Sequence, residues 1–172
     1  MQMRLTFELD GLTVAPAGPA DEPREFLPLF NADSDFVDAS TLRTGKRAFD
    51  EDAAAMFLWQ SELMENSHRL SVRDAEGRLV AAITVLLPHP TEQQPWLGAL
   101  LVRADTNLDT TASPVIAALE TALAKARWSA LFISPMTSQH GRISWWRSMG
   151  YDPVGVRVDN DKREALVLRK EL

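Results

Sequence analysis

The chain has 172 residues, of which 45% are hydrophobic, so it is long enough to bury one core and short for two domains. Its 18 basic and 24 acidic residues give a formal charge of −6 without a clustered basic patch, which argues against nucleic acid or an anionic membrane surface as a partner. The absence of cysteine excludes disulfides and thiolate chemistry, and with no signal peptide and no apolar run near the roughly 20 residues of a spanning helix, we expect a cytoplasmic protein with a single domain over residues 1–172.

The N-terminal region contains two candidate strands, of which one is expected to start the sheet, and then a predicted helix. Residues 4–9 and 12–15 alternate loosely on either side of Asp10-Gly11, a strong turn signal. After the breaking segment AGPADEP, a helix is expected from Pro23, because proline is favoured in a first helical turn. The apolar positions of this helix are Phe26, Leu29 and Phe30.

A loop and a second helix are predicted next. Residues 31–46 are mostly small and polar, which favours a loop with at most one turn of helix. Asp50 is a typical helix cap, and the acidic residues after it suit the positive end of the helix dipole. One face of this helix is expected to carry Met56, Trp59, Gln60, Leu63 and Met64.

A hairpin and a buried strand occupy the middle of the chain. Residues 69–73 and 78–87 are predicted strands, and the Asp74-Ala75-Glu76-Gly77 segment between them is typical of a tight turn. A loop bracketed by prolines then leads to residues 96–102, WLGALLV. This continuous apolar run predicts a central strand that is covered on both faces.

A polar loop, residues 103–110, separates this strand from a helix. Asp109, Thr110 or Thr111 can cap the helix, and Pro114 fits its first turn. A helix start after a strand directs backbone N–H groups and the positive helix end at one place, which in many proteins binds phosphate. The positions expected to lie on the sheet are Val115, Ile116, Leu119, Leu123 and Ala126.

The C-terminal region predicts a strand, a short helix and a hairpin. These elements are residues 128–133, residues 142–149 with Gly150 as the C-terminal cap, and strands 151–158 and 163–168 around Asp159-Asn160-Asp161. The strand-helix-strand unit in the middle implies a parallel pair and the hairpins imply antiparallel ones. The sheet of this α/β (α+β) fold should therefore be mixed.

The tryptophans are interpreted mainly as packing residues. We expect Trp59 and Trp128 in the core, and also Trp96, which could instead line an acceptor pocket. Adjacent helical positions point about 100° apart, so one of Trp145 and Trp146 should pack on the sheet and the other should face a cleft or solvent. Trp145 is the better candidate for packing.

Several phrases of the sequence resemble the GNAT superfamily of acyl-CoA-dependent N-acetyltransferases. LTVAPAGPAD is similar to the first strand and turn of that family, RLVAAITVLL to its third strand, PWLGALLV to its fourth, and WWRSMGYDPVG to its C-terminal phrase. Together with the element order, the resemblance covers nearly the whole chain. It implies a single-domain GNAT-like fold with a mixed, strongly twisted sheet of about seven strands flanked by about four helices.

The resemblance also implies where an acyl-CoA would bind. In the family the fourth and fifth strands, here 96–102 and 128–133, splay apart, pantetheine enters the gap, and a strand bulge lies nearby, with which Gly98 is compatible. The backbone of Leu100, Leu101 and Val102 would pair with pantetheine, and Trp146 occupies the position of a frequent tyrosine acid. The pyrophosphate loop would be Asn107, Leu108, Asp109, Thr110, Thr111 and Ala112.

The sequence departs from the family at two of these places. The family's loop has glycines where bare backbone approaches the phosphates, whereas residues 107–112 contain none, and Asp109 adds a negative charge. Thr110 and Thr111 supply donors that partly compensate. The indole of Trp146 cannot protonate a leaving thiolate, and the only tyrosine, Tyr151, matches a packing position.

Candidates for the catalytic base are few. They are Glu92 before the central strand, Asp33 and Asp35 in the predicted loop, and His140 after the strand 128–133. Such residues are more often solvated surface side chains than catalytic bases. No metal-binding, nucleotide-loop or serine-hydrolase motif occurs.

Two functions remain open from the sequence. The first is an enzyme that transfers an acetyl group from acetyl-CoA to a small-molecule or peptide amine by direct attack. The alternative is a non-catalytic relative that binds a ligand or a protein, and it is motivated by the glycine-free loop and the missing tyrosine. Pairing of an edge strand into a homodimer is a third hypothesis.

Overall fold

The computed structural model describes residues 5–18, 21–41, 45, 47–63, 65–159 and 162–172. Within these residues, eight strands form one mixed sheet in the order β1-β2-β3-β4-β5-β6-β8-β7, with only β5 and β6 parallel. The strands are β1 (Phe7–Leu9), β2 (Leu12–Pro16), β3 (Ser67–Asp74), β4 (Leu79–Leu86), β5 (Trp96–Val102), β6 (Ala130–Ile133), β7 (Asp152–Val158) and β8 (Glu164–Glu171). The helices are α1 (Pro23–Phe30), α2 (Ser34–Thr41), α3 (Glu51–Glu62), α4 (Ser113–Lys125) and α5 (His140–Ser148), and a π-helical turn, η1 (Leu108–Ala112), precedes α4. The predicted mixed, helix-flanked sheet is confirmed.

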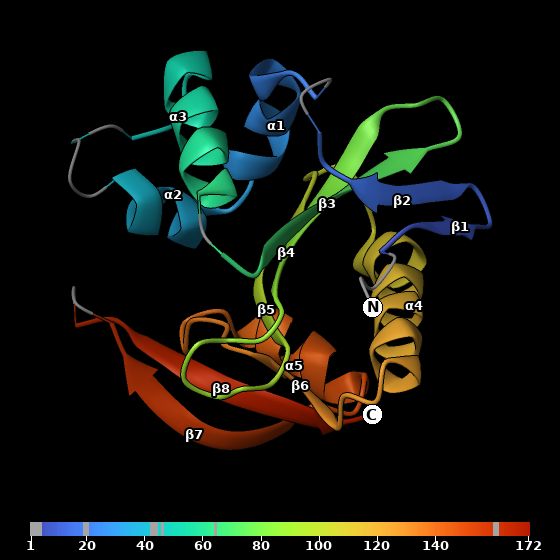
Figure 1. The fold of residues 1–172 in the computed structure, drawn as a ribbon. Helices are drawn as coiled ribbons and strands as arrows, with labels where there is room; N and C mark the ends of the chain where they lie inside the picture. The colour runs from blue at the N-terminus through green and yellow to red at the C-terminus, as the bar shows by residue number, and fades with distance from the viewer. Residues whose placement is uncertain (1–4, 19–20, 42–44, 46, 64, 160–161) are drawn as a thin grey trace.

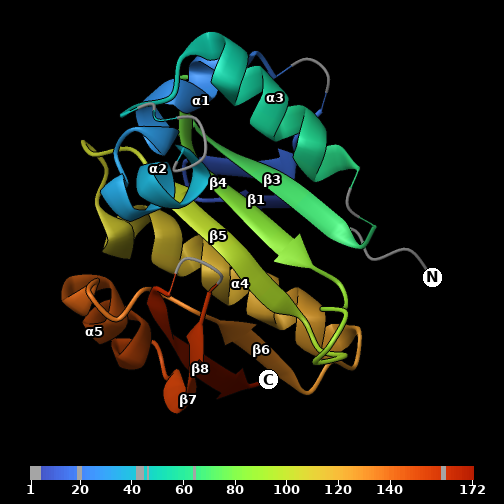
Figure 2. The same ribbon diagram turned by 90° about the vertical axis from the view of Figure 1, so that its left-hand side faces the viewer.

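Both faces of the sheet are covered, which explains the apolar runs of its central strands. Helices α1–α3 gather on one side of the sheet and α4 lies on the other (Figure 1, Figure 2). Leu79, Ala82 and Leu101 join the core under α1–α3, whereas Ile83 and Leu100 join the core under α4. β5 therefore separates two cores, as its continuous hydrophobic pattern predicts.

The β3–β4 hairpin and the N-terminal hairpin follow the turn signals. Gly77 has φ +79°, and its N–H donates to the carbonyl of Asp74 at 2.9 Å, which closes the predicted turn. Gly11 has φ +70° between β1 and β2. Both glycines thus occupy the left-handed conformation that other residues adopt only at a cost.

The expected loop over residues 31–46 is wrong at Ser34–Thr41, because α2 forms there. The Asp33 carboxylate accepts the Phe36 N–H at 3.0 Å and so starts the helix, while Val37 is buried. Phe36 packs on Phe30 with ring centroids 5.2 Å apart. A short polar segment becomes helical because tertiary contacts cover its few apolar side chains.

Helix α3 begins where predicted, with the Asp50 carboxylate accepting the Ala53 N–H at 2.8 Å, but it turns a different face to the core. Trp59 is 59% exposed, so its expected core position is wrong. Ala54 and Leu58 are buried instead, and the Phe57 ring packs on the aromatic cluster of α1 and α2. Met56 and Leu63 are also exposed, and Met64 lies outside the described residues.

The start of α4 differs from the prediction at its cap. Asn107, rather than Asp109, Thr110 or Thr111, caps the segment, and η1 runs into α4 with Pro114 in its first turn. The predicted packing positions are confirmed for Val115, Ile116, Leu119 and Leu123, which are buried, whereas Ala126 is half-buried.

The C-terminal elements follow their predicted order with shifted ends. Strand β6 starts at Ala130, so Trp128 precedes it and is only partly buried. Gly150 has φ +90° and caps α5, with its N–H donating to the Arg147 carbonyl at 3.0 Å. Both Trp145 and Trp146 are buried, at 9% and 1% exposure, so neither faces solvent.

Candidate functional site

The site begins where two parallel strands separate. β5 and β6 pair only through Trp96–Phe132 and Leu97–Ile133. Beyond these pairs β5 continues to Val102 paired with β4, but without β6 on its other side. Gly98 forms the extra residue of a bulge, because Leu97 pairs with Val85 and Ala99 with Thr84, the next residue of β4. The bulge lets Leu97 and Leu100 share one face of the sheet although they are three positions apart.

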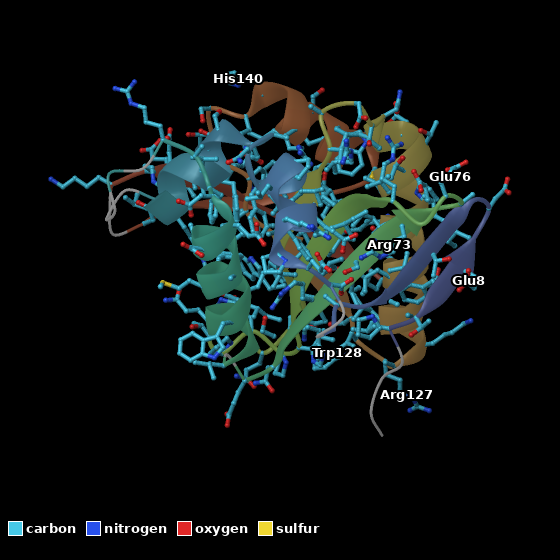
Figure 3. The ribbon with its side chains drawn as sticks, turned by 90° about the horizontal axis from the view of Figure 1, so that it is seen from above. Glu8, Arg73, Glu76, Arg127, Trp128 and His140 are labelled. Carbon is cyan, nitrogen blue, oxygen red and sulfur yellow. The ribbon has the colours of Figure 1, made fainter. Side chains whose placement is uncertain are left out.

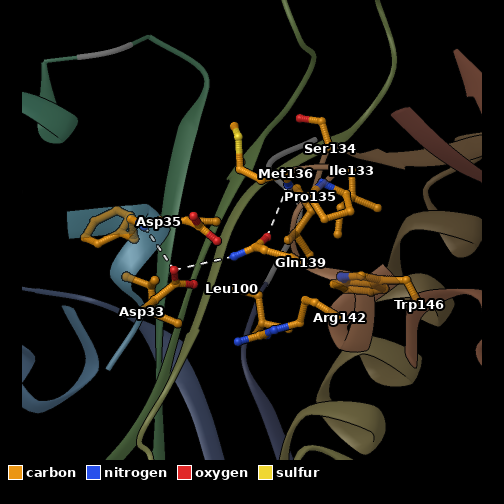
Figure 4. Close-up of a pocket in the computed structure, with 15 residues that line it drawn as sticks. Asp33, Asp35, Leu100, Ile133, Ser134, Pro135, Met136, Gln139, Arg142 and Trp146 are labelled. Carbon is orange, nitrogen blue, oxygen red and sulfur yellow. Dashed lines mark hydrogen bonds between the residues drawn. The ribbon is translucent and has the colours of Figure 1, made fainter. Parts of the chain in front are cut away.

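A cavity of about 190 Å³ lies at this separation (Figure 4). Its floor is β5, one wall is the start of α2, and the other wall is the end of β6 with the first turns of α5. The lining residues are Asp33, Asp35, Phe36, Leu97, Gly98, Ala99, Leu100, Leu101, Ile133, Ser134, Pro135, Met136, Gln139, Arg142 and Trp146.

Two carboxylates stand on the α2 wall. Asp33 and Asp35 are both half-buried. One oxygen of Asp33 accepts the Phe36 N–H, and the Gln139 amide donates to the same oxygen at 3.5 Å. The Gln139 carbonyl oxygen accepts the Met136 N–H at 3.2 Å, so one amide side chain links both walls of the cavity (Figure 4).

Arg142 supplies a positive charge on the opposite wall. Burial lowers the pKa of its guanidinium, and the negative charge of Asp33 works against this shift. Within the described part of the chain Arg142 forms neither a hydrogen bond nor an ion pair, although it is one of the residues that line the cavity (Figure 4). A half-buried cation without a bonded partner is suited to bind an anionic group.

The predicted pyrophosphate loop lies outside the cavity lining, and its donors are engaged. The Asn107 side-chain oxygen accepts the N–H groups of Asp109 at 2.7 Å and Thr110 at 3.4 Å. Asp109 in turn accepts the indole N–H of Trp145 at 3.1 Å, which ties η1 to α5. Thr111 and Ala112 are buried. In this arrangement the loop offers a negative charge and few available N–H groups.

The candidate bases fall into two groups. Asp33 and Asp35 line the cavity together with Leu100, Leu101 and Trp146. The other members of the predicted set, Val102, Leu108 and the rest of the loop, do not line it.

Glu92 and His140 lie elsewhere. Glu92 forms an ion pair with Arg157, whose guanidinium lies 4.5 Å from the Trp96 ring centre. His140 is exposed at the start of α5 and projects from the edge of the molecule (Figure 3). Trp96 is buried and stacks on Phe132, which supports its interpretation as a core residue.

Tyr151 is a packing residue, as predicted. Its ring is fully buried 5.0 Å from that of Trp146, and its hydroxyl donates to Glu120 at 2.7 Å. Burial and the charge of Glu120 raise the pKa of the phenol. Tyr151 does not line the cavity, so it cannot deliver a proton there.

Sequence reasoning missed Arg142 and Gln139. A usable signal for Arg142 was its spacing, because it precedes Trp146 by four positions on a predicted helix and therefore shares its face. Gln139 had no comparable signal, since it lies before the helix.

No model of a known protein family matches the sequence, and neither does any curated protein. Solved structures do match it. A probable GNAT-family acetyltransferase from Chromobacterium violaceum superposes with a TM-score of 0.72 at 15% identity, covering 99% of this chain and 93% of the other. A GNAT-family acetyltransferase from Elizabethkingia anophelis with acetyl-CoA bound gives 0.66 at 11%, covering 95% and 100%. Spermidine N-acetyltransferase from Vibrio cholerae, in complex with CoA and spermine, gives 0.67 at 11%, covering 94% and 95%.

This chain has the GNAT fold. The likeness extends over nearly its full length, and the cavity lies at the strand separation that the sequence resemblance located. Among the described residues of this GNAT-fold chain, no helix is long and apolar enough to cross a membrane, and no group of three metal-ligating side chains comes together.

Proposed function

We propose that this GNAT-fold chain is an N-acyltransferase that moves an acetyl group from acetyl-CoA to an amine by direct attack. The observation that carries the proposal is the unpaired side of β5 beside a cavity with two carboxylates. The acetyltransferases of the same fold, including those with acetyl-CoA or CoA bound, support it.

The thioester half of the co-substrate fits the residues present. Beyond Leu97, the backbone groups of β5 that point away from β4 have no strand partner within the described residues, so they can bond pantetheine amides and a developing oxyanion. When bound, acetyl-CoA supplies the activated carbonyl. Leu100 and Leu101 contribute main-chain atoms, a role that their side chains do not restrict.

The carboxylates handle the proton of the amine. Asp33 or Asp35 accepts a proton from the attacking nitrogen, which leaves a neutral amide after the carbon–sulfur bond breaks. The departing thiolate takes its proton from water, because the Trp146 indole is not an acid and Tyr151 lies outside the cavity.

The pyrophosphate half fits less well. The N–H groups at the start of η1 are occupied by Asn107, and Asp109 repels phosphate. We therefore expect weak binding of acetyl-CoA compared with a glycine-rich loop.

Calorimetric titration with acetyl-CoA, followed by a CoA-release assay with a panel of amines, tests the proposal. Because a general base contributes about 10²- to 10⁴-fold, Asp33→Asn or Asp35→Asn should lower kcat by at least about 100-fold. Asp38→Asn is the matched control, since Asp38 is exposed on the same helix and does not line the cavity. No binding at millimolar acetyl-CoA, or equal rates for all three variants and the wild type, would refute the proposal.

A non-catalytic binding module is the second candidate function, and the occupied donors of η1 favour it. The double substitution Leu108→Gly and Thr110→Gly restores bare backbone at the loop. If this variant binds CoA and the wild type does not, the natural protein is better described as a binding module. Comparable CoA binding by both chains would instead support the enzyme.

A further inference from the structure

The cavity presents opposite charges on its two walls. Asp33 and Asp35 stand on the α2 side, and Arg142 extends from α5 on the other (Figure 4). Between them the lining is largely apolar, with Leu97, Leu100, Ile133, Met136 and Trp146. A ligand that fills this space contacts a negative wall, a positive wall and apolar side chains.

Arg142 needs an anionic partner. Its guanidinium is half-buried, and its attraction to Asp33 does not reach the distance of an ion pair. A guanidinium has five N–H donors in a planar fork that matches a carboxylate in two parallel hydrogen bonds. No described side chain meets this requirement, so a ligand carboxylate would complete the site.

We propose that the acceptor amine of this chain is an amino acid, in which the amine and a carboxylate belong to one small molecule. The proposal rests on the proposed acyl transfer. Asp33 and Asp35 hold the ammonium and accept the two protons that its nitrogen loses, one before the attack and one after it. Arg142 holds the carboxylate, and the apolar lining contacts an aliphatic side chain. N-acylation then forms one amide bond to nitrogen, breaks the thioester bond, and leaves the carboxylate unchanged.

The charge pattern disfavours polyamines as acceptors. A polyamine held by Asp33 or Asp35 has further ammonium groups, and in a cavity of about 190 Å³ one of them would approach Arg142. Like charges in a half-buried site repel with little screening by salt. The cavity thus selects for a single ammonium accompanied by a carboxylate.

Three acceptors that share one aliphatic group separate these possibilities. L-leucine carries a carboxylate, L-leucinamide carries a neutral amide in its place, and 3-methylbutylamine carries neither group. Spermidine is the fourth acceptor and represents the polyamines. CoA release measures kcat/KM for each with the wild type and with Arg142→Gln. Because the amines differ in basicity, the quantity compared is the ratio of wild type to variant for each acceptor.

For L-leucine this ratio should be about 30 to 300, because truncating one partner of a buried charge pair is costly. The ratio for 3-methylbutylamine should be at least about tenfold smaller. Arg142→Lys should restore part of the activity toward leucine, and Arg147→Gln, which removes an exposed charge from the same helix outside the cavity, should leave it unchanged. Thermal unfolding of each variant establishes that it is folded.

Calorimetric binding of L-leucine without acetyl-CoA distinguishes failure of this inference from failure of the proposed acyl transfer. If the chain binds leucine through Arg142 but does not bind acetyl-CoA, the amino-acid site is retained and the acyl transfer is refuted. Acetylation of spermidine or 3-methylbutylamine with equal ratios for all acceptors would retain the transfer and overturn the inference. No leucine binding and no leucine acetylation would also overturn it.

Discussion

Replacing Asp109 by asparagine should strengthen acetyl-CoA binding. The carboxamide keeps an oxygen that can accept the Trp145 indole N–H, so the contact between η1 and α5 is preserved while the charge is removed. Asp109 is exposed, so the interaction is weakened as in water, where two unit charges 4 Å apart contribute about 1 kcal/mol. Repulsion between this carboxylate and a pyrophosphate with two charges weakens the binding free energy of acetyl-CoA by about 1–2 kcal/mol. Asp109→Asn should therefore lower the Kd for acetyl-CoA about 5- to 30-fold.

Calorimetry with two ligands tests the physical reasoning behind this number. The gain should be present for acetyl-CoA, should shrink between about 20 mM and about 300 mM salt, and should be absent for acetyl-pantetheine, which has no pyrophosphate. Asp52→Asn on α3 is the control for net charge, since Asp52 is exposed and distant in sequence from the loop. An equal gain for acetyl-pantetheine, or no gain at low salt, would show that the pyrophosphate does not lie beside Asp109.

The remaining predictions concern stability and use urea unfolding. Tyr151→Phe removes the hydroxyl that donates to Glu120, so it should lower the free energy of unfolding by about 1 kcal/mol without changing acetyl transfer. A loss of acetyl transfer would place Tyr151 in the site. Because the phenol's pKa is raised above its usual 10.0, wild-type stability should be full below about pH 10 and fall as pH rises further, a decline that the phenylalanine variant should lack. Leu58→Ala should lower the free energy of unfolding by about 2–4 kcal/mol, because Leu58 is buried. Trp59→Ala on the same helix should change it by no more than about 0.5 kcal/mol, because Trp59 is exposed. The reverse order would contradict the observed buried face of α3. Phe30→Ala opens the centre of an aromatic cluster and should cost about 3–5 kcal/mol; a cost near zero would mean that the cluster closes around the gap.

Local signals predicted most of the elements. The Asp74–Gly77 turn, the apolar run of β5 and the helical spacing of Val115 to Leu123 each depend on neighbours in the chain, and all three appear in the structure. Turn chemistry and hydrophobic period are properties of short segments, so they are available without the fold.

The errors share a different cause. Helix α2 forms because Phe36 and Val37 are covered by α1 and α3. Trp59 is exposed because the Phe57 and Leu58 side of α3 packs on α1 and α2. Neither contact can be read from a segment alone. A helix of mixed composition has several faces that could be buried, and its neighbours decide which one is.

The candidate site also has a part that the sequence predicted and a part that only the fold provides. The resemblance located the strand separation and named Leu100, Leu101 and Trp146 near it, and residue chemistry offered Asp33 and Asp35 alongside Glu92 and His140. Only the fold brings the two aspartates to the cavity and removes the other two from it.

By itself the sequence determined the order of the elements apart from α2, the doubly covered β5 and the absence of glycine from the loop before α4, because these follow from composition and spacing along the chain. The tertiary structure alone decided that Arg142 faces Asp33 across a cavity, and that Asn107 and Trp145 occupy the polar groups of the loop. These pairs are separated by between two and more than a hundred residues, and their energies depend on burial and on distance in space. The chemistry of the candidate site therefore depends on the separation of β5 and β6 beyond Leu97, which is a property of the tertiary structure.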